Sequence, residues 1–202
     1  MNKVIFINWF QTLSYQPIWH HLETQNHSLF QFLKEHVLDT PLKNDWLTGR
    51  VSFCNIWHHL NTYGIPKEVI QTQTMNWMSN ITVEAELLSL IQQVRRYGYK
   101  VVIATNHVDI FGNYLYPYLH LEDYFDDYIS SAEVGFLKTQ QDENKNYPFF
   151  VAYLKKHQLT YQDCILIDKA KDVTDIYHHL GMTTFTTTHT QETIDILNSF
   201  LK

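Results

Sequence analysis

Short apolar runs alternate along the chain with stretches in which apolar residues recur at helical spacing. Residues 4–7 and 165–167 are unbroken apolar runs rich in β-branched side chains, and 100–104 is such a run after its first residue, Lys100. In contrast, 83–97 carries Leu87, Leu88, Ile91 and Val94 on one helical face. Continuous apolar runs are typical of parallel strands buried on both faces, and helical periodicity between them is typical of βα units. The pattern predicts an α/β fold with a doubly wound parallel sheet.

A long segment between the first run and the helix before the second has a different character. Its apolar spacing predicts three helices, at 29–37, 51–63 and 67–78. Pro41 and its neighbours are expected to interrupt the helical pattern. We therefore predict a core formed by residues 1–13 and 81–202, with residues 14–80 inserted after the first strand as a helical unit.

Polar side chains follow the predicted strands. Asn8 ends the first apolar run, Thr105 and Asn106 end the second, and Asp168 ends the last. In open α/β sheets, ligands bind outside the carboxyl ends of the strands. We therefore expect these four side chains to lie near one another and to mark the candidate site.

Four short motifs resemble those of the haloacid dehalogenase (HAD) superfamily of hydrolases. In chain order they are Asn8-x-Phe10-x-Thr12-Leu13, Thr105-Asn106, Ser131-x-Glu133-Val134-Gly135-x-x-Lys138 and Asp168-x-x-x-Asp172. The order and spacing of four motifs over nearly the whole chain are more specific than any one of them. The resemblance implies a Rossmann-like α/β HAD core, with residues 14–80 as a helical cap that closes over the site and selects the substrate.

The first motif departs from the family pattern. Superfamily phosphatases have Asp-x-Asp there: the first carboxylate attacks phosphorus, and the second transfers the proton to the leaving group. Asn8 and Phe10 occupy these positions. An amide is a poor nucleophile, and a phenyl ring can neither donate nor accept a proton. The resemblance therefore implies a hydrolase scaffold with impaired or absent phosphatase chemistry. One hypothesis is that the protein is a ligand- or partner-binding pseudoenzyme, and the alternative is an active hydrolase.

The remaining motifs keep the residue types that the family uses around a phosphoryl group. The resemblance implies that Thr105 and Asn106 hydrogen-bond the transferring oxygens and that Lys138 neutralises their charge. Taken alone, a lysine such as Lys138 is more often a solvated loop residue, and only the four motifs together favour a site role. Thr139 stands where the family usually has proline, so the departures are not confined to the first motif.

The resemblance also implies a metal site. Residue 8, Asp168 and Asp172 would hold Mg²⁺, a hard cation that prefers carboxylate oxygens and water. Asn8 removes one negative charge from this set, so we expect weakened Mg²⁺ affinity. The alternative for Asp172 is a structural role in the first turn of its helix.

Three residues admit alternative interpretations. Asn8 is the natural residue, an engineered replacement of Asp, or a residue that deamidates to Asp after synthesis. An Asp at this position favours an active hydrolase of phosphatase or dehalogenase type. Phe10 either packs beneath the cap or marks a dehalogenase-type site, because the two-carbon dehalogenases carry an aromatic residue there and expel a halide that needs no proton. Arg50 either reaches an anionic substrate or is a surface residue.

Composition limits the partners. The net charge of -6 and the lack of a basic stripe argue against nucleic acid, and we expect no membrane association because the opening apolar run is short. Cys54 and Cys164 fit buried free thiols in a reducing compartment. These features predict a cytoplasmic protein, which we expect to be a monomer or homodimer. The family resemblance implies a small anionic metabolite as its partner.

Overall fold

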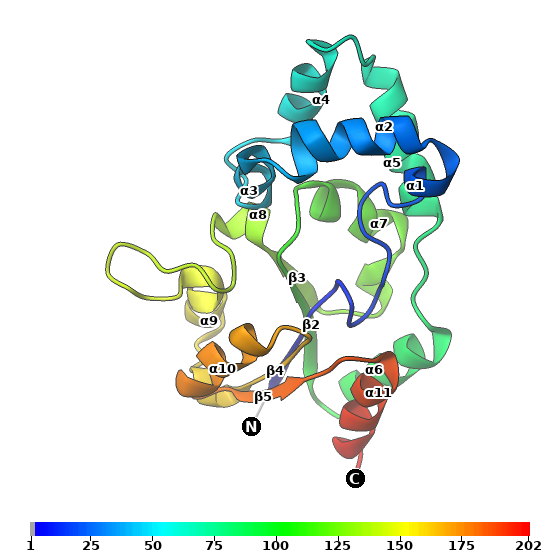
Figure 1. Ribbon diagram of the computed structural model, residues 1–202. Coiled ribbons are helices and arrows are strands. Elements are labelled where there is room, and N and C mark those ends of the chain that lie inside the picture. Colours follow the sequence, from blue (N-terminus) through cyan, green and yellow to red (C-terminus); the bar gives the residue numbers. More distant parts are fainter. Residues whose placement is uncertain (1–2) are drawn as a thin grey trace.

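A five-stranded, wholly parallel sheet organises the computed structural model, which describes residues 3–202 (Figure 1). Its strands are β1 (Val4–Ile7), β2 (Lys100–Thr105), β3 (Asp127–Ser130), β4 (Cys164–Asp168) and β5 (Thr183–Thr186), in the order β3-β2-β1-β4-β5. β1 is central, and all residues of β1 and β4 are buried. The unbroken apolar runs therefore form the middle of the sheet, as the sequence predicts.

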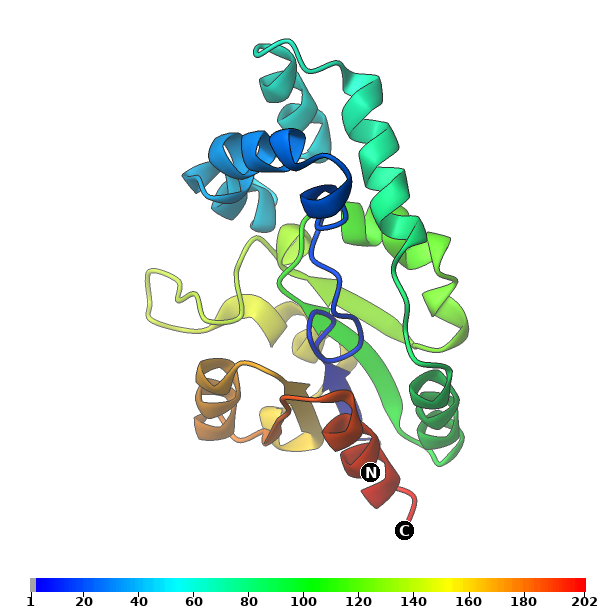
Figure 2. The same cartoon turned by 45° about the vertical axis from the view of Figure 1, so that its right-hand side comes forward.

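Helices cover both faces of the sheet, which confirms the doubly wound prediction (Figure 2). On one face Ile5 and Ile7 belong to the same apolar cluster as residues of α6 (Ala85–Arg96) and α11 (Thr190–Ser199). On the other face Val4 and Phe6 pack with α9 (Val151–His157) and α10 (Lys171–His179). Successive residues of a strand point to opposite faces, so each apolar run supplies both layers.

The chain between β1 and α6 forms a helical insertion beyond one end of the sheet (Figure 1). Its helices are α1 (Leu22–Gln25), α2 (His27–Leu33), α3 (Pro41–Leu47), α4 (Phe53–Asn61) and α5 (Lys67–Ser79), and a π-helical segment, Lys34–Leu38, continues α2. The break expected at Pro41 and its neighbours lies at Asp39 and Thr40, whereas Pro41 begins α3, a helix that was not predicted. Proline lacks only an N–H that the first helical position does not use, and Thr40 caps the helix by accepting from the N–H of Leu42 at 3.2 Å.

The other short elements connect the strands. They are a second π-helical segment (Phe111–Leu115), α7 (Tyr116–Tyr118), α8 (Ser131–Val134) and 3-10 turns at Leu121–Asp123, Pro148–Phe150 and Tyr161–Asp163. Cys164 is buried as expected, but Cys54 is exposed, because it lies on the outer side of α4. Within residues 3–202, no helix combines the length and the apolar character needed to cross a membrane.

Tryptophans join the insertion to the core. Trp9, Trp19, Trp46 and Trp77 are each at most 2% exposed and belong to the apolar cluster that also contains one face of the sheet. The indole N–H of Trp46, in the insertion, donates to Asp109 Oδ1, in the core, at 2.7 Å. The polar atom of this buried ring therefore has a hydrogen-bond partner. Insertion and core therefore share one continuous apolar interior.

Gly49 lies where the insertion meets the core most tightly. It adopts φ +68°, and a Cβ atom built on it would lie 2.0 Å from the carbonyl oxygen of Ala132 in α8. We predict that Gly49→Ala lowers the free energy of unfolding by more than about 2 kcal/mol, since it adds a backbone clash to left-handed strain. The measurement is urea denaturation of both proteins.

Gly64→Ala is the matched control. Gly64 also has positive φ, +81°, but no atom lies within 4 Å of its built Cβ. This variant meets only the conformational penalty, about 1 kcal/mol. Equal losses in the two variants would contradict the close approach of Gly49 to α8.

Candidate functional site

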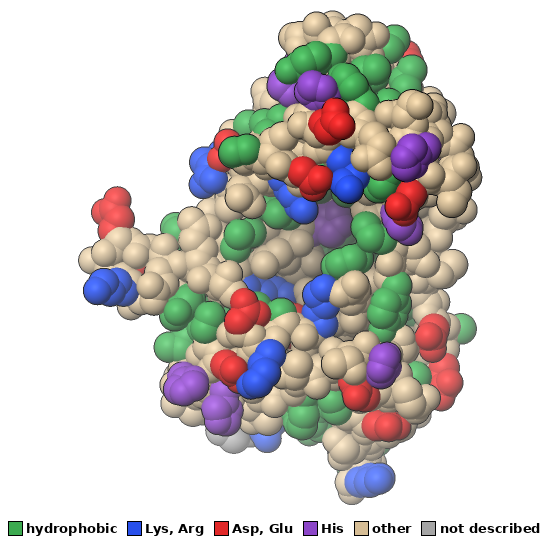
Figure 3. Space-filling model, in the orientation of Figure 1, with side chains coloured by type: hydrophobic (Ala, Val, Ile, Leu, Met, Phe, Trp, Pro, Cys, Tyr) green, Lys and Arg blue, Asp and Glu red, His purple; other side chains and the backbone are tan. Residues whose placement is uncertain are grey.

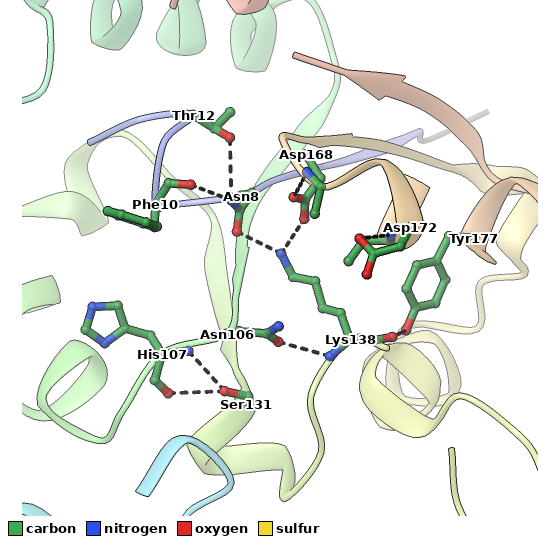
Figure 4. Close-up of polar contacts among 12 residues, drawn as sticks. Asn8, Phe10, Thr12, Asn106, His107, Ser131, Lys138, Asp168, Asp172 and Tyr177 are labelled. Carbon is green, nitrogen blue, oxygen red and sulfur yellow. Dashed lines mark hydrogen bonds and ion pairs between the residues drawn. The ribbon is translucent and has the colours of Figure 1, made fainter. Parts of the chain in front are cut away.

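Asn8 is fixed at the carboxyl end of β1 by hydrogen bonds on both sides of its amide (Figure 4). Nδ2 donates to the carbonyl oxygen of Phe10 at 2.7 Å and approaches Thr12 Oγ1 at 3.5 Å, while Oδ1 accepts from Lys138 Nζ at 2.8 Å. A carbonyl can only accept and an ammonium can only donate, so this is the one amide orientation that satisfies both partners. The uncharged amide of Asn8 therefore lies between the Phe10 carbonyl and the Lys138 ammonium and is hydrogen-bonded to both.

Lys138 connects three motifs. Its Nζ lies 2.6 Å from Asp168 Oδ2, and the two side chains are only 2% and 3% exposed. Its backbone N–H donates to Asn106 Oδ1 at 3.0 Å, and the Tyr177 hydroxyl donates to its carbonyl at 2.9 Å. Burial lowers the pKa of the Lys138 ammonium, and the carboxylate of Asp168 opposes that shift. The charged pair is thus held by contacts at both backbone and side chain.

A polar cavity of about 100 Å³ opens at these residues. It is lined by Asn8, Phe10, Asn106, Lys138, Asp168, Lys169, Ala170 and Val173. Two of these side chains are cationic and one is anionic, and the carboxylate of Asp168 is already paired with Lys138. Lys169 contacts Gln11 Oε1 and lies 4.8 Å from the centre of the Phe10 ring. The charge balance of the cavity favours an anion.

An apolar pocket of about 220 Å³ adjoins the polar cavity. Its walls are Trp9, Phe10, Gln16, Pro17, Ile18, Leu38, Lys43, Trp46, Leu47, Asn106, His107 and Val108. Figure 3 shows a hollow on this face between the insertion and the core, with hydrophobic side chains around it and lysine or arginine side chains near its edge. Phe10 and Asn106 line both spaces, so the cavity and the pocket meet at these two residues.

His107 forms part of the pocket wall as a neutral group. Its ring lies 5.2 Å from that of Phe111 and 6.1 Å from that of Trp77, and burial lowers its pKa to about 4. Nδ1 lies 3.3 Å from the carbonyl oxygen of Val108, which requires the proton on Nδ1. The backbone N–H of His107 donates to Ser131 Oγ at 3.0 Å, which ties this segment to α8.

The predicted site residues separate into two groups. Those that line the polar cavity are Asn8, Phe10, Asn106, Lys138 and Asp168. Thr105 is fully buried and does not line it; its Oγ1 has no hydrogen-bond partner among the described residues. Asp172 is exposed and accepts from the N–H of Val173 at 2.9 Å. Arg50 is exposed and pairs with Asp45 at 2.7 Å, outside both the cavity and the pocket.

Two of the lining residues that sequence analysis missed have side chains able to bind a ligand and stand next to predicted site residues. His107 directly follows Asn106, and Lys169 directly follows Asp168. The signal was available, because residues just beyond the carboxyl end of a parallel strand face the ligand site whether or not they belong to a motif. Both were overlooked because neither occupies a motif position.

The oxygens of the site are arranged poorly for a divalent cation. Lys138 Nζ occupies the space between Asn8 Oδ1 and Asp168 Oδ2, while Asp168 Oδ1 accepts from the N–H of Ala170 and the Phe10 carbonyl accepts from Asn8. Mg²⁺ requires oxygens that are free to coordinate, and usually negative charge. Among residues 3–202, no group of three or more His, Cys, Asp or Glu side chains is placed to hold a metal ion. In this arrangement, Mg²⁺ would have to compete with the existing hydrogen bonds of these oxygens.

The Lys138–Asp168 pair gives a stability prediction. Lys138→Met leaves the Asp168 carboxylate buried without its partner, so we expect a loss of about 3 kcal/mol in the free energy of unfolding at pH 7. Adding Asp168→Asn removes the unpaired charge and should recover at least about 1 kcal/mol in urea denaturation. A single variant as stable as the parent would contradict a buried, charged pair.

Comparison with known proteins was made by sequence and by structure. No protein-family model and no curated protein matches the sequence. A HAD-family enzyme of Bacteroides thetaiotaomicron, crystallised with magnesium and inorganic phosphate, is 19% identical with a TM-score of 0.70, covering 92% of this chain and 94% of that one. A predicted HAD-like family hydrolase of Porphyromonas gingivalis is 16% identical with a TM-score of 0.71, covering 100% and 98%.

A further similar structure is a dehalogenase. The L-2-haloacid dehalogenase of Xanthobacter autotrophicus, with chloropropionic acid covalently bound, is 14% identical with a TM-score of 0.63, covering 93% of this chain and 78% of that one. At such identities the likeness concerns the fold alone. It agrees with the resemblance carried by the four motifs, and the chain has the fold of the haloacid dehalogenase superfamily.

Proposed function

We propose that this protein binds a small anion in the polar cavity and does not hydrolyse phosphate esters. The observation that carries the proposal is the position of the Lys138 ammonium, which is buried between the neutral amide of Asn8 and the carboxylate of Asp168. A second carboxylate at residue 8 would balance the lysines of the cavity. With Asn8, a positive charge remains for a ligand to neutralise.

The cavity lacks groups for the two steps of a superfamily phosphatase, which are nucleophilic attack on phosphorus and proton transfer to the leaving group. The Asn8 amide is uncharged and held in two hydrogen bonds, and the Phe10 ring can neither donate nor accept a proton. Asp168 is the one carboxylate among the lining residues, but Lys138 and the Ala170 N–H occupy its oxygens. A covalent intermediate therefore has no obvious nucleophile.

Donors for an anion are nevertheless present. Asn106 accepts the Lys138 N–H through Oδ1, which leaves its Nδ2 group to donate into the cavity beside the ammonium groups of Lys138 and Lys169. Charge-assisted hydrogen bonds of this kind are stronger than neutral ones. The similar enzyme of Bacteroides thetaiotaomicron was crystallised with inorganic phosphate, which agrees with a small oxyanion as the ligand class.

In this proposal, the helical insertion acts as a cap for the site. Trp46 and Leu47 of α3 and Leu38 of the π-helical segment reach the pocket beside Phe10. The insertion thereby contributes a wall that the α/β core cannot supply, and it would select ligands by the shape of that wall. The division at residues 13/14 and 80/81 belongs to the same proposal.

A hydrolase is the second candidate, and Phe10 is the observation that favours it. Its ring borders the apolar pocket, where a substrate that releases halide would need no proton donor. The similar dehalogenase carries a covalently bound chloropropionic acid, whereas this chain has an amide at residue 8. The second candidate requires Asp at residue 8, either by deamidation or in the natural protein. Peptide mass spectrometry over residue 8 distinguishes the amide from the acid.

Turnover assays test the primary proposal. We predict that the chain releases neither phosphate nor halide above background from a broad substrate panel in Mg²⁺, because no lining group can serve as nucleophile. Asn8→Asp should create dehalogenase or weak phosphatase activity, and Asn8→Asp with Phe10→Asp should raise phosphate release by at least about a hundredfold over the single variant. Phe10→Asp alone is the matched control and should stay inactive.

Turnover by the unaltered chain would reject the pseudoenzyme interpretation. Activity in the restored variants alone would instead show an intact scaffold that lacks only its reacting groups. Binding of inorganic phosphate by the unaltered chain, followed by calorimetry, tests the anion site directly.

Magnesium provides a separate test. Because two lysines and one carboxylate line the cavity, we expect millimolar Mg²⁺ to leave the melting temperature of the unaltered chain unchanged. Asn8→Asp supplies a carboxylate and should create Mg²⁺-dependent stabilisation in the same thermal assay. Equal stabilisation of both proteins would contradict the weakened site, and Asp172→Asn in the Asn8→Asp background tests whether the exposed carboxylate contributes.

A further inference from the structure

We propose that the ligand of this site is an amphiphilic anion, with its charged group in the polar cavity and an apolar body the size of one aromatic ring in the adjoining pocket. The inference rests on the proposed function, since the charged group would use the same cavity. It adds a ligand class that anion binding alone does not specify.

The two spaces are placed for one molecule. Phe10 and Asn106 line both, so a ligand that contacts Asn106 with its charged group can continue across the Phe10 ring into the pocket. Lys169 lies 4.8 Å from the centre of that ring. The charged and apolar parts of the site therefore meet at these two side chains and need no conformational rearrangement to be joined.

The dimensions fit a small apolar group. The pocket measures about 220 Å³, whereas an apolar cavity of about 150 Å³ is enough to bind benzene. Drug-sized ligands occupy about 300 Å³ or more. The pocket thus accommodates one ring or a short branched chain, and the polar cavity, at about 100 Å³, leaves room for a phosphate or carboxylate group.

Apolar side chains dominate the wall and stay partly uncovered. Ile18, Leu38 and Leu47 are half-buried, and all three belong to the segment inserted after β1. Trp9 forms the wall from the core side. Covering such surface with an apolar ligand group removes it from water, which favours binding in proportion to the area covered.

Charge in the pocket is confined to its edge. Lys43 is exposed, and no other lysine, arginine or carboxylate is among the lining residues. His107 stays neutral at pH 7 because burial lowers its pKa to about 4. With its proton on Nδ1 toward Val108, its Nε2 is an acceptor available to a hydroxyl or amino group of the ligand. A second anionic group would meet no buried cation here.

Two π-helical segments flank the pocket and form an independent observation. Leu38 ends the segment Lys34–Leu38 and lines the pocket, while Phe111 begins the segment Phe111–Leu115 and packs 5.4 Å from Trp9 and 5.2 Å from His107. Such segments are rare and occur frequently at functional sites. Both therefore agree with a ligand pocket at this place.

Four probes measured by calorimetry with the full chain test the inference. Phenylphosphonate, methylphosphonate and inorganic phosphate separate the ring from the anion, and phenylacetate tests whether a carboxylate can replace the phosphonate. The carbon–phosphorus bond is not hydrolysed by phosphatase chemistry, so binding is read whether or not the protein turns over esters. We expect phenylphosphonate to bind at least about tenfold more tightly than methylphosphonate.

Two pocket variants and one control locate the effect. Ile18→Trp fills the pocket and should reduce the preference for phenylphosphonate to less than about threefold, while methylphosphonate binding, which reports an intact fold and anion site, stays unchanged. Leu38→Ser removes apolar wall without filling the space and should weaken only the phenyl probes. Leu42→Trp is the control: Leu42 is half-buried but lies outside the pocket, so the preference should persist.

The outcomes separate this inference from the proposed function. Equal binding of phenylphosphonate and methylphosphonate would overturn the amphiphilic ligand and leave anion binding intact. Lack of binding by all four probes would overturn both. A preference that survives in Ile18→Trp would place the ring elsewhere and so reject the pocket, whereas tight phenylacetate binding supports the ligand class with a carboxylate as its charged group.

Discussion

The buried ammonium of Lys138 is the interaction on which the arrangement of the site depends. It joins Asp168 at the end of β4 to Asn8 at the end of β1, and its own backbone is fastened to Asn106 after β2. Three strand ends that are distant in the sequence are thereby held at one point. Removing a charged group of this kind from water is costly, and the cost is met only because the carboxylate and the amide oxygen are both in place.

The same ammonium determines how the neutral side chain of Asn8 affects the charge balance of the cavity. In a site with two carboxylates, a lysine between them is fully neutralised and a cation can be added. With Asn8, the neutral amide turns its N–H group toward Phe10 and its oxygen toward Lys138, so both ends of the amide are hydrogen-bonded within the protein. Lys169 adds a further positive charge next to Phe10. The amide in place of a carboxylate therefore leaves one unbalanced positive charge in the cavity, which favours an anionic ligand.

Sequence was sufficient for the centre of the sheet and for most of the cavity. β1, β2 and β4 are unbroken apolar runs buried on both faces, and that burial is itself what makes such runs recognisable. β5 was not predicted, because it is an edge strand of threonines and one phenylalanine with exposed ends. Asn8, Asn106 and Asp168 were placed together because parallel strands end at one edge, and Lys138 was added through the motif resemblance. Thr105 was placed with them by the same strand-end argument, but it is fully buried and does not line the cavity.

The apolar pocket could not be read from the sequence in the same way. Its walls come from the loop after β1, from α3 and from the residues after β2, and their meeting depends on how the insertion packs. Apolar residues such as Ile18 and Leu47 have the same pattern whether they face a core or an empty space. For Arg50, in contrast, the sequence suggested a ligand contact that the structure does not have. Its guanidinium pairs with Asp45 outside the cavity and the pocket.

The shared tryptophan interior has a consequence for how quickly a ligand can enter and leave. Asp109, just beyond β2, accepts from the Trp46 indole at 2.7 Å and from the Phe53 N–H at 2.9 Å, so the insertion is fastened to the core at the start of α4 as well as through α3. A hinged opening of the whole insertion would break these bonds and expose Trp19, Trp46 and Trp77 to water at once. Exchange through local movement of the half-buried side chains at the pocket mouth costs far less. Residence time would then be governed by rotamer changes at a few residues, and the two parts of the chain would stay together throughout the binding cycle.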